Sequence, residues 1–537
     1  MRMEIVFFLI SCLLLFTNHH HLLCPVEAAQ NSEYPYSFMT TDAEKAAART
    51  YDYIIVGGGA AGCPLAATLS QNYTVLVLER GGSPYGNPVT ADNKVFYKVF
   101  GNASDYPYEL EGFVTEDGVQ TARGRVLGGG TSVNAGFYSR ASLQYIRNMG
   151  WDEKIVNESY EWVEKSNAFK PDKLFVWSSA VRDGLLEAGV LPYNGYTLNN
   201  LEGTKISATI FDNNGKRHTA ADLLQHANPD NIIVLLNATA SRILFDSSSG
   251  KLKATGVEFT GTNGKSYQVS TNKSTNLSEV ILSAGPIGSP QLLLLSGIGP
   301  SDELEKLNIA VHLDLKLVGK RVQDPPRATV IIESPKPLEF GNIQIVGIID
   351  NSNIYIEPTS YFTEINATHN EYYGVIFSKV AYPLSTGELK LRSKDPRDVP
   401  SVRYNYYSNP SDLKECMLGV KTLTRISMTS SLQKFAFNVS GNSKMLQYSG
   451  SALPQNPSDN DALAKFCKDT RSSIWHFHGG CQIDLVIDKM HHVKGVDSLR
   501  VVDNSIFKDS PGTNPQATTM MLGRYMGLHI LKERIGN

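Results

Sequence analysis

The segment Tyr51 to Gly62 reads Y-D-Y-I-I-V-G-G-G-A-A-G and decides the fold class of this chain. Its first half is a short β-branched run of the kind that forms buried strands, and consecutive glycines follow it. Cys63 to Ser70 can continue as a helix, and Thr74 to Leu78 form a second apolar run that closes at Glu79. This order predicts a βαβ unit at the start of a mixed α/β fold.

The glycines of this segment match the G-x-G-x-x-G pattern of dinucleotide-binding proteins. Gly57 permits the turn, Gly59 lets the backbone approach a pyrophosphate, and Gly62 lets the helix pack against the strand. The helix N-terminus supplies amide donors and positive potential, and Glu79 can accept hydrogen bonds from ribose hydroxyls. The context predicts a dinucleotide site, but it does not separate FAD from NAD.

Composition limits the class of partner. The chain has 537 residues, of which 42% are hydrophobic and 19% are charged, so we expect a globular protein with two successive or interleaved domains. Its formal charge is −3 and its basic residues are scattered, which argues against nucleic acid as the partner. A small molecule is the expected partner.

The N-terminus has the order of a secretory signal peptide. The apolar run Ile5 to Phe16 follows a basic start, and a polar stretch ends in small residues, so we expect residues 1–28 to be removed after Ala28. The run is shorter than the about 20 residues of a membrane-spanning helix, and no later stretch qualifies. A signal anchor is the alternative. His19 to His21 fall inside the removed segment and form no metal site.

The secretory route permits disulfides and N-glycans. Cys416 and Cys467 lie in polar, helical surroundings outside the glycine motifs, so we expect them to pair. Cys63 and Cys481 have small or apolar neighbours, which indicates buried free thiols. The Asn-X-Ser/Thr sequons stand at Asn72, Asn102, Asn157, Asn237, Asn272, Asn276, Asn366 and Asn438.

The rest of the chain alternates between two kinds of pattern. Ser178 to Ala188 is typical of a helix, whereas Ile232 to Phe245 and Glu279 to Ser283 return as strands and an apolar helix starts at Pro290. Residues 327 to 402 alternate apolar and polar side chains with frequent prolines, which predicts an antiparallel sheet. We expect this sheet to form a separate wall.

Two further segments resemble the signature patterns of the glucose-methanol-choline (GMC) oxidoreductases. They are Arg123 to Asn134, R-G-R-V-L-G-G-G-T-S-V-N, and Gly285 to Gly299, G-P-I-G-S-P-Q-L-L-L-L-S-G-I-G. The likeness covers essentially the whole mature chain. It is closest to the plant mandelonitrile lyase-like branch, whose W-H-x-H-G-G-C segment stands here at Trp475 to Cys481.

The resemblance implies a Rossmann-like FAD-binding domain interleaved with an antiparallel-sheet substrate domain. We expect the FAD-binding domain to comprise residues 45–160, 230–325 and 465–537, and the substrate-binding domain to comprise residues 161–229 and 326–464. A loop of consecutive glycines can lie against the flat isoalloxazine, while Thr131, Ser132 and Asn134 can form hydrogen bonds with its polar edge. Val133 stands where some members attach the flavin to a histidine, so we expect non-covalent FAD.

The expected cofactor-binding residues follow from the glycine pattern and from the resemblance. Ala240 matches the position whose backbone meets the adenine in the family. The full set is Gly57, Gly59, Ala60, Ala61, Gly62, Glu79, Arg80, Val126, Gly129, Gly130, Thr131, Asn134, Ala135, Gly136, Phe137, Ala240, Trp475, Asp503, Pro515 and Gln516.

His476 matches the catalytic base of the family. An alcohol must lose its hydroxyl proton as hydride leaves carbon, and an imidazole titrates near the working pH. The alternative is a packed structural histidine. His478 completes an H-x-H pattern that also occurs in metal sites, but no third ligand is signalled nearby, so we expect no metal.

Asn514 matches the second member of the family's catalytic pair, which is His-His in some members and His-Asn in others. Its alternative role is structural, because Asn-Pro is typical of a helix start and Asn514 can cap a helix over Pro515 to Leu531. Such a helix would direct its positive end at the pyrimidine edge of the flavin.

The resemblance implies two activities. The best-known lyases of the branch carry a His-His pair and a tyrosine before the tryptophan, whereas this chain has Asn514 and Ile474 there. We therefore expect a secreted, extracellular FAD-dependent oxidoreductase that oxidises an alcohol to an aldehyde or ketone, with hydride passing to flavin N5. Oxygen or another acceptor would reoxidise the flavin. The alternatives are an (R)-hydroxynitrile lyase acting on a cyanohydrin, and a protein that keeps FAD only for stability.

Overall fold

The computed structural model describes residues 34–91, 107–275, 277–349, 351, 353–366, 369–440 and 443–536. The expected signal peptide and the sequons at Asn102 and Asn276 lie outside the described residues. Residues Pro35–Asn537 form one unit without a further division, so the boundaries between the two expected domains stay a prediction. No helix among the described residues has both the length and the apolar character needed to cross a bilayer.

A six-stranded parallel sheet carries the first glycine motif, in the strand order β1-β11-β4-β3-β15-β29. Four of its strands are short apolar runs buried on both faces, as expected for a parallel sheet covered by helices. The strands are β1 Met39–Thr40, β3 Tyr53–Val56, β4 Val75–Leu78, β11 Ile232–Leu235, β15 Glu279–Leu282 and β29 Leu499–Val501. Helix α2 (Gly62–Leu69) links β3 to β4, which confirms the predicted βαβ unit.

Some expected elements have different bounds. The run from Ile232 to Phe245 is two strands, β11 and β12 (Thr239–Asp246), because the chain leaves the parallel sheet and enters an antiparallel one with β13 (Leu252–Thr260) and β14 (Ser266–Thr271). Helix α8 (Gly285–Leu295) begins before Pro290, and α13 (Gln516–Gly536) runs past Leu531.

A seven-stranded sheet confirms the predicted wall up to residue 380, in the order β27-β19-β22-β21-β20-β9-β8. The prediction was wrong for the rest of the segment, because β23 (Gly387–Lys390) and β24 (Ser401–Arg403) form a separate three-stranded sheet with β18 (Lys320–Val322). The seven-stranded sheet is antiparallel except for the edge pair β8 and β9, and it recruits strands from outside residues 327 to 402. The strands are β8 Tyr193–Tyr196, β9 Gly203–Ile206, β19 Pro326–Ser334, β20 Ile345–Ile349, β21 Ile354–Asn366, β22 His369–Val380 and β27 Ser472–Ser473.

The two faces of this sheet differ in chemistry because side chains alternate along each strand. One face carries Val330, Ile356 and Ile376 into an apolar core with helices α7 (Val176–Glu187), α10 (Pro410–Ser427) and α12 (Asn460–Asp469). The predicted disulfide Cys416–Cys467 joins α10 to α12, and Cys63 and Cys481 are buried free thiols as expected. The opposite face mixes aromatic and charged side chains and contributes to the candidate site.

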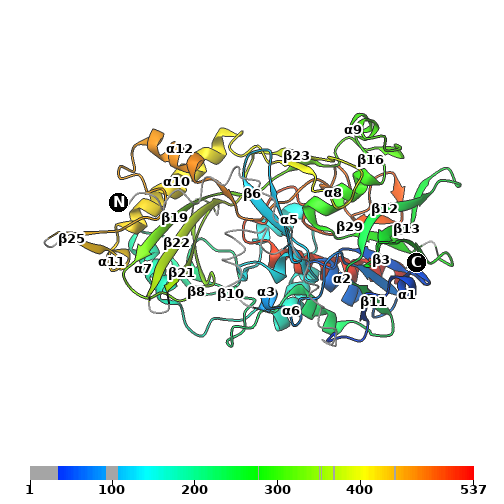
Figure 1. The fold of residues 1–537 in the computed structure, drawn as a ribbon, viewed down its shortest axis with the longest axis horizontal. Coiled ribbons are helices and arrows are strands. Elements are labelled where there is room, and N and C mark those ends of the chain that lie inside the picture. Colours follow the sequence, from blue (N-terminus) through cyan, green and yellow to red (C-terminus); the bar gives the residue numbers. More distant parts are fainter. Residues whose placement is uncertain are drawn as a thin grey trace, which may run out of the picture. The chain divides into compact units, whose positions relative to one another are not determined.

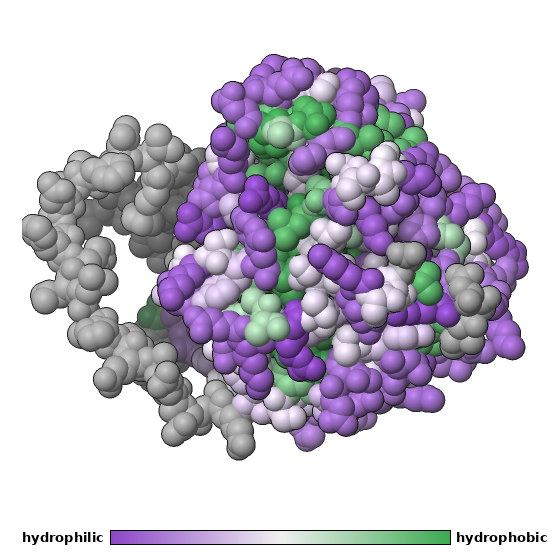
Figure 2. Space-filling model, turned by 90° about the vertical axis from the view of Figure 1, so that its right-hand side faces the viewer, coloured by the Kyte–Doolittle hydropathy of each residue, from purple (hydrophilic) through white to green (hydrophobic). Residues whose placement is uncertain are grey.

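Figure 1 shows these parts within the described unit. The seven-stranded sheet with α7, α10 and α12 lies on the left, and β3, β11 and β29 lie on the right with α2 in front of them. Segments from both ends of the sequence meet there, because blue β3 and α2 lie beside the red C-terminal helix. The face in Figure 2 is mostly hydrophilic, with hydrophobic residues grouped between hydrophilic ones, as is usual for a protein surface.

Candidate active site

The first glycine loop is too crowded for side chains at two positions. Gly57 has φ +104°, and a Cβ there would lie 2.4 Å from the carbonyl oxygen of Ser283. A Cβ on Gly62 would lie 2.0 Å from the carbonyl oxygen of Gly57. These glycines let β3 turn into α2 and let the helix pack closely, which is the arrangement that exposes a helix N-terminus to a phosphate.

Gly59 has a different reason to be glycine. A Cβ there would meet no protein atom closer than 3.9 Å, and the same test finds nothing within 4 Å of Gly130 in the second loop. The protein itself leaves room for a side chain at both positions, so the open space fits a bound molecule that approaches the backbone. These two glycine backbones therefore fit the pyrophosphate and ring system of FAD.

Glu79 lies at the end of β4, as expected for the residue that binds the ribose. Its carboxylate accepts the N–H of Gly58 at 2.9 Å and of Gly81 at 2.8 Å, so both oxygens already support the loop. A carboxylate oxygen has a second lone pair, which leaves acceptor capacity for a ribose hydroxyl. Ala238 donates its N–H to the Glu79 carbonyl, which brings the chain near Ala240 to this end of the site.

The second loop follows β6 (Gln120–Gly124) and forms a 3₁₀ turn over Gly129–Ser132. Gly128 and Gly129 have left-handed φ of +88° and +57°. A Cβ on Gly129 would lie 2.9 Å from the Cα of Gly59, so the two glycine loops touch. Ala60 and Ala61 continue the first loop into α2 beside this contact.

Polar side chains fix the second loop to the C-terminal helix. Asn134 Nδ2 donates to Gln516 Oε1 at 2.9 Å, and Gln516 Nε2 donates to the Phe137 carbonyl at 2.5 Å. Arg217 donates to the carbonyl oxygens of Asn134 and Thr131 at 2.7 and 3.2 Å. The predicted residues Asn134, Phe137 and Gln516 therefore form one connected group, next to Pro515 at the start of α13. Sequence reasoning missed Arg217.

The hydroxyls of this loop are engaged within the protein. Thr131 donates to the Gly128 carbonyl at 2.6 Å and accepts the Ala220 N–H at 2.9 Å, and Ser132 donates to the Leu127 carbonyl at 2.8 Å. Their hydrogen bonds hold the shape of the loop. Val133 is buried among Val126, Leu110 and Ala122, with Trp475 packed against them.

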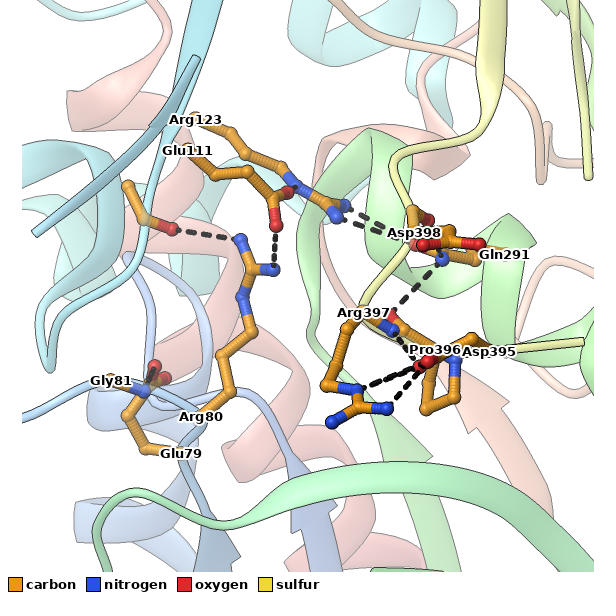
Figure 3. Close-up of polar contacts among 11 residues, drawn as sticks. Glu79, Arg80, Gly81, Glu111, Arg123, Gln291, Asp395, Pro396, Arg397 and Asp398 are labelled. Atoms are coloured by element: carbon orange, nitrogen blue, oxygen red, sulfur yellow. Dashed lines mark hydrogen bonds and ion pairs between the residues drawn. The ribbon is translucent and has the colours of Figure 1, made fainter. Parts of the chain in front are cut away.

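A chain of charged and amide groups joins the two signature segments, and Figure 3 shows Glu111 between the guanidinium groups of Arg80 and Arg123. Arg123 approaches Gln291 Oε1 at 3.4 Å, and Gln291 donates to the carbonyl of Asp398 at 2.9 Å. Burial lowers the pKa of Arg123 to about 10. Arg80 follows Glu79 directly, so this network braces the carboxyl end of β4.

Asp503 ties the second signature to the C-terminal segment. Its carboxylate accepts the Gly285 N–H at 2.9 Å, the Ser289 hydroxyl at 2.5 Å and the Ser505 N–H at 2.8 Å. Gly285 and Ser289 lie in the first turns of α8, which follows β15, and Ser505 follows β29, so the contacts gather at the carboxyl edge of the parallel sheet. This is the edge at which open α/β sheets bind ligands.

The segment with the expected base runs from β27 out of the seven-stranded sheet. Trp475 has a left-handed φ of +62° and donates its N–H to the Ser473 hydroxyl at 3.0 Å. The next N–H, of His476, donates to Asp324 Oδ1 at 3.1 Å, and Tyr406 donates its hydroxyl to Asp324 Oδ2 at 2.6 Å. Burial raises the pKa of Asp324 to about 6.

An apolar cluster brings the second glycine loop and the base-bearing segment together on the mixed face of the sheet. Phe137 is buried with Tyr355, Val375 and Phe377, and Ala135 and Ile474 pack against them. Ala135 and Gly136 come from the second glycine loop, whereas Ile474 is two residues before His476. Residues that are far apart in the sequence therefore meet at one site.

One ring nitrogen of His476 is left unpaired by the described part of the protein. The residue is half-buried, and its Nδ1 is enclosed without a hydrogen-bond partner among the described residues. Burial lowers its pKa well below 6.5, and the charges of Lys379 and Arg327 lower it further. The imidazole is therefore neutral at neutral pH and able to accept a proton.

The contacts of His478 and Asn514 bear on the two alternative roles expected for them, which are metal binding and helix capping. His478 Nδ1 lies 3.1 Å from the His476 carbonyl, and burial lowers the pKa of His478 to about 4. No group of three or more His, Cys, Asp or Glu suited to a metal ion occurs in the described part of the chain. Asn514 Oδ1 accepts from Lys379 Nζ at 2.8 Å instead of a helix N–H, so its side chain does not act as a cap here.

Three buried ionisable residues at the site were missed by sequence reasoning. Arg327, Glu357 and Lys379 have 5%, 0% and 1% of their surface exposed, and all lie on strands of the seven-stranded sheet. Lys379 Nζ lies 3.9 Å from Glu357 Oε1. The sequence carries no distinctive signal for them, because polar residues alternate with apolar ones along these strands.

Comparisons with known proteins agree with this geometry. A family model described as GMC oxidoreductase matches residues 51–327, and its C-terminal counterpart matches residues 383–523. A sinalpyl alcohol oxidase of Nesocodon mauritianus is 43% identical and covers 98% of this chain and 97% of its own. An (R)-mandelonitrile lyase of Prunus serotina is 42% identical, over 90% of this chain and 86% of its own.

A solved structure supports the fold alone. The formate oxidase of Aspergillus oryzae superposes with a TM-score of 0.75 at 19% identity, over 91% of this chain and 99% of its own. The family models match both glycine loops and the base-bearing segment, and the likeness to the plant alcohol oxidase extends over nearly the whole chain. The chain therefore belongs to the GMC oxidoreductase family.

Proposed function

We propose that this protein is an FAD-dependent enzyme that oxidises an alcohol to an aldehyde or ketone. Membership of the family implies FAD, which supplies a hydride acceptor when bound. The observation that carries the proposal is the buried Nδ1 of His476, which has no hydrogen-bond partner among the described residues, in the segment whose Ile474 packs against the second glycine loop. A buried polar atom without a partner requires an explanation, and a catalytic role supplies one for His476.

Each residue of the site has its own role in the proposed oxidation. His476 takes the hydroxyl proton on its imidazole, and Asp324 holds the backbone of His476 in place. Asn514 donates its amide N–H to the same substrate oxygen. The nearby positive charges of Arg327 and Lys379 favour negative charge on that oxygen, because electrostatic interactions are strong in a site from which water is excluded.

FAD is held without a covalent bond in this proposal. Val133 occupies the position at which some family members carry the attaching histidine, and its aliphatic side chain is 5% exposed within an apolar cluster. The phosphates fit the glycine backbones at Gly57 and Gly59, the ribose fits Glu79, and the ring system fits the loop from Gly129 to Phe137. The division into FAD-binding and substrate-binding domains belongs to the same proposal.

Secretion and N-glycosylation are also proposed. Four described sequon asparagines are exposed, as an oligosaccharide requires: Asn72, Asn157, Asn237 and Asn438. The side chain of Asn157 forms hydrogen bonds with Arg140 and Glu161, so a glycan there would replace them. Removal of residues 1–28 would be seen as a shortened N-terminus after expression in eukaryotic cells.

A second candidate is the cleavage of a cyanohydrin into an aldehyde and cyanide. It is favoured by the 42% identity to an (R)-mandelonitrile lyase. One experiment distinguishes the two. FAD-loaded protein is mixed anaerobically with primary and secondary alcohols and with mandelonitrile, while flavin absorbance and free cyanide are followed. Loss of the flavin colour with an alcohol supports oxidation, whereas cyanide release with an unchanged flavin spectrum supports the lyase.

A further inference from the structure

The side chain of Asn514 is held by a lysine from another element. Lys379 Nζ, on β22, donates to Asn514 Oδ1 at 2.8 Å, and both residues are buried. An ammonium group only donates hydrogen bonds, so the amide oxygen must face the lysine. The amide nitrogen, with two N–H donors, then faces away from Lys379.

The sheet register places the charged Lys379 next to a second buried cation. It lies directly opposite Arg327 on β19 and opposite Tyr355 on β21, and its Nζ is 4.7 Å from the centre of the Tyr355 ring. Like charges directly opposite each other destabilise a sheet. Two buried cations side by side therefore indicate a role other than stability.

The carboxylate of Glu357 lies near the ammonium group of Lys379 and stabilises its position. Glu357 Oε1 lies 3.9 Å from Lys379 Nζ, and both carboxylate oxygens are enclosed by the protein. Burial raises the pKa of Glu357, which the charges of Lys379 and Arg327 and the Asn514 amide oppose. The amide group of Asn514 thus lies between a cation at its oxygen and a carboxylate nearby.

We propose that Lys379 is a positioning residue that fixes the orientation of the Asn514 amide, so that an N–H group is always presented to the substrate oxygen, and that Glu357 holds Lys379 for this task. The inference rests on the proposed function, since it assigns the donor of the same site. Without Lys379 the amide can rotate by half a turn and present its oxygen, which cannot donate to an alcohol or carbonyl oxygen.

The test is a double-mutant cycle with Lys379→Met and Asn514→Ala. The methionine keeps the volume of the lysine stem but has neither charge nor donor. We expect Lys379→Met alone to lower kcat/KM by about 10²-fold, because loss of positioning costs this much. In the Asn514→Ala background the same change should cause no further loss on the pH plateau, since the group that Lys379 orients is gone.

Two further measurements separate positioning from a structural role. Benzaldehyde is titrated into the FAD-loaded proteins and its binding is read from the flavin difference spectrum, which needs no turnover. Benzaldehyde binding should weaken in Lys379→Met and Asn514→Ala to the same extent, and Lys379→Gln, which can still donate a hydrogen bond, should restore part of it.

The second measurement is the pH profile of kcat/KM. Its acid limb should move to higher pH in Lys379→Met, because the cation lowers the pKa of His476.

Lys205 provides the matched control. It is the other fully buried lysine of the same sheet, and its Nζ donates to Ser139 Oγ at 2.8 Å and to backbone carbonyls. Lys205→Met should lower stability without moving the pH limb or the benzaldehyde titration.

Additive losses in the cycle, or an unchanged benzaldehyde titration in Lys379→Met, would overturn the inference. If no alcohol bleaches the wild-type flavin, the proposed oxidation fails instead, and the benzaldehyde titration still decides the role of Lys379.

Discussion

The carboxylate of Asp324 accepts the backbone N–H of His476 at 3.1 Å from a position with only 2% of its surface exposed. Asp324 lies just before β19, so the contact links the wall to the base-bearing segment. Because this carboxylate is buried, the protonation state of Asp324 affects the free energy of unfolding.

The pKa of Asp324 predicts a pH dependence of stability. Burial raises this pKa from 3.8 to about 6, so between these values the folded state keeps a proton that the unfolded state has lost. The contribution of Asp324 to the free energy of unfolding therefore falls as the pH rises through this window. Asp324→Asn has no such proton, so its stability relative to wild type should rise between pH 4 and pH 6.5 in urea titrations. A constant difference would contradict this.

Gly59 and Gly62 should respond differently to alanine. Gly62→Ala places a Cβ 2.0 Å from a backbone oxygen and should prevent folding, whereas Gly59→Ala meets no protein atom closer than 3.9 Å. We expect Gly59→Ala to fold with an unchanged far-UV spectrum but to lose most of its bound FAD, because the Cβ would enter the pyrophosphate space. FAD absorbance per protein after purification measures this. Full FAD occupancy in Gly59→Ala would show that the cofactor does not approach this backbone.

The disulfide should contribute to stability and not to chemistry. Cys416 and Cys467 are 51 residues apart and lie in the apolar core on the face of the sheet opposite to Lys379. Replacing both by alanine should lower the free energy of unfolding by about 2–5 kcal/mol. The rate of flavin bleaching by alcohol in the folded fraction should stay the same, and a large change in that rate would place the disulfide in the site.

The buried pair Glu357 and Lys379 should oppose stability. Burial lowers the pKa of Lys379 to about 8, because the ammonium group loses its hydration in the folded protein. The double variant Glu357→Gln/Lys379→Met should be as stable as wild type or more stable, by up to about 4 kcal/mol at pH 7, while its kcat/KM falls. Denaturant unfolding and steady-state assays on the same preparation check both parts. A loss of stability with unchanged kcat/KM would make the pair structural.

The parts of the fold that could be predicted depend on local pattern. The βαβ unit follows from a short apolar strand and glycines in sequence order, the wall follows from side-chain alternation, and the pairing of Cys416 with Cys467 follows from their polar helical surroundings. The roles of His476 and Asn514 rested on resemblance to a family, because a histidine beside a tryptophan has no distinctive local pattern.

The buried charges could not be predicted because they depend on register between strands. Lys379 faces Arg327 only through the pairing of β19 with β22, and sequence does not give that pairing. A shift of one residue would turn these side chains to the apolar face. Similarly, the contact of Asn134 with Gln516 joins residues at opposite ends of the chain.

The proton-accepting role of His476 is tested most directly by anaerobic mixing of the FAD-loaded protein with an alcohol that it oxidises. Wild type should bleach the flavin at a rate that stays constant to pH values below 6.5, because the pKa of His476 is lowered. His476→Ala, with the same FAD content, should bleach about 10²- to 10⁴-fold more slowly. Bleaching by His476→Ala at the wild-type rate would contradict the assignment of the base.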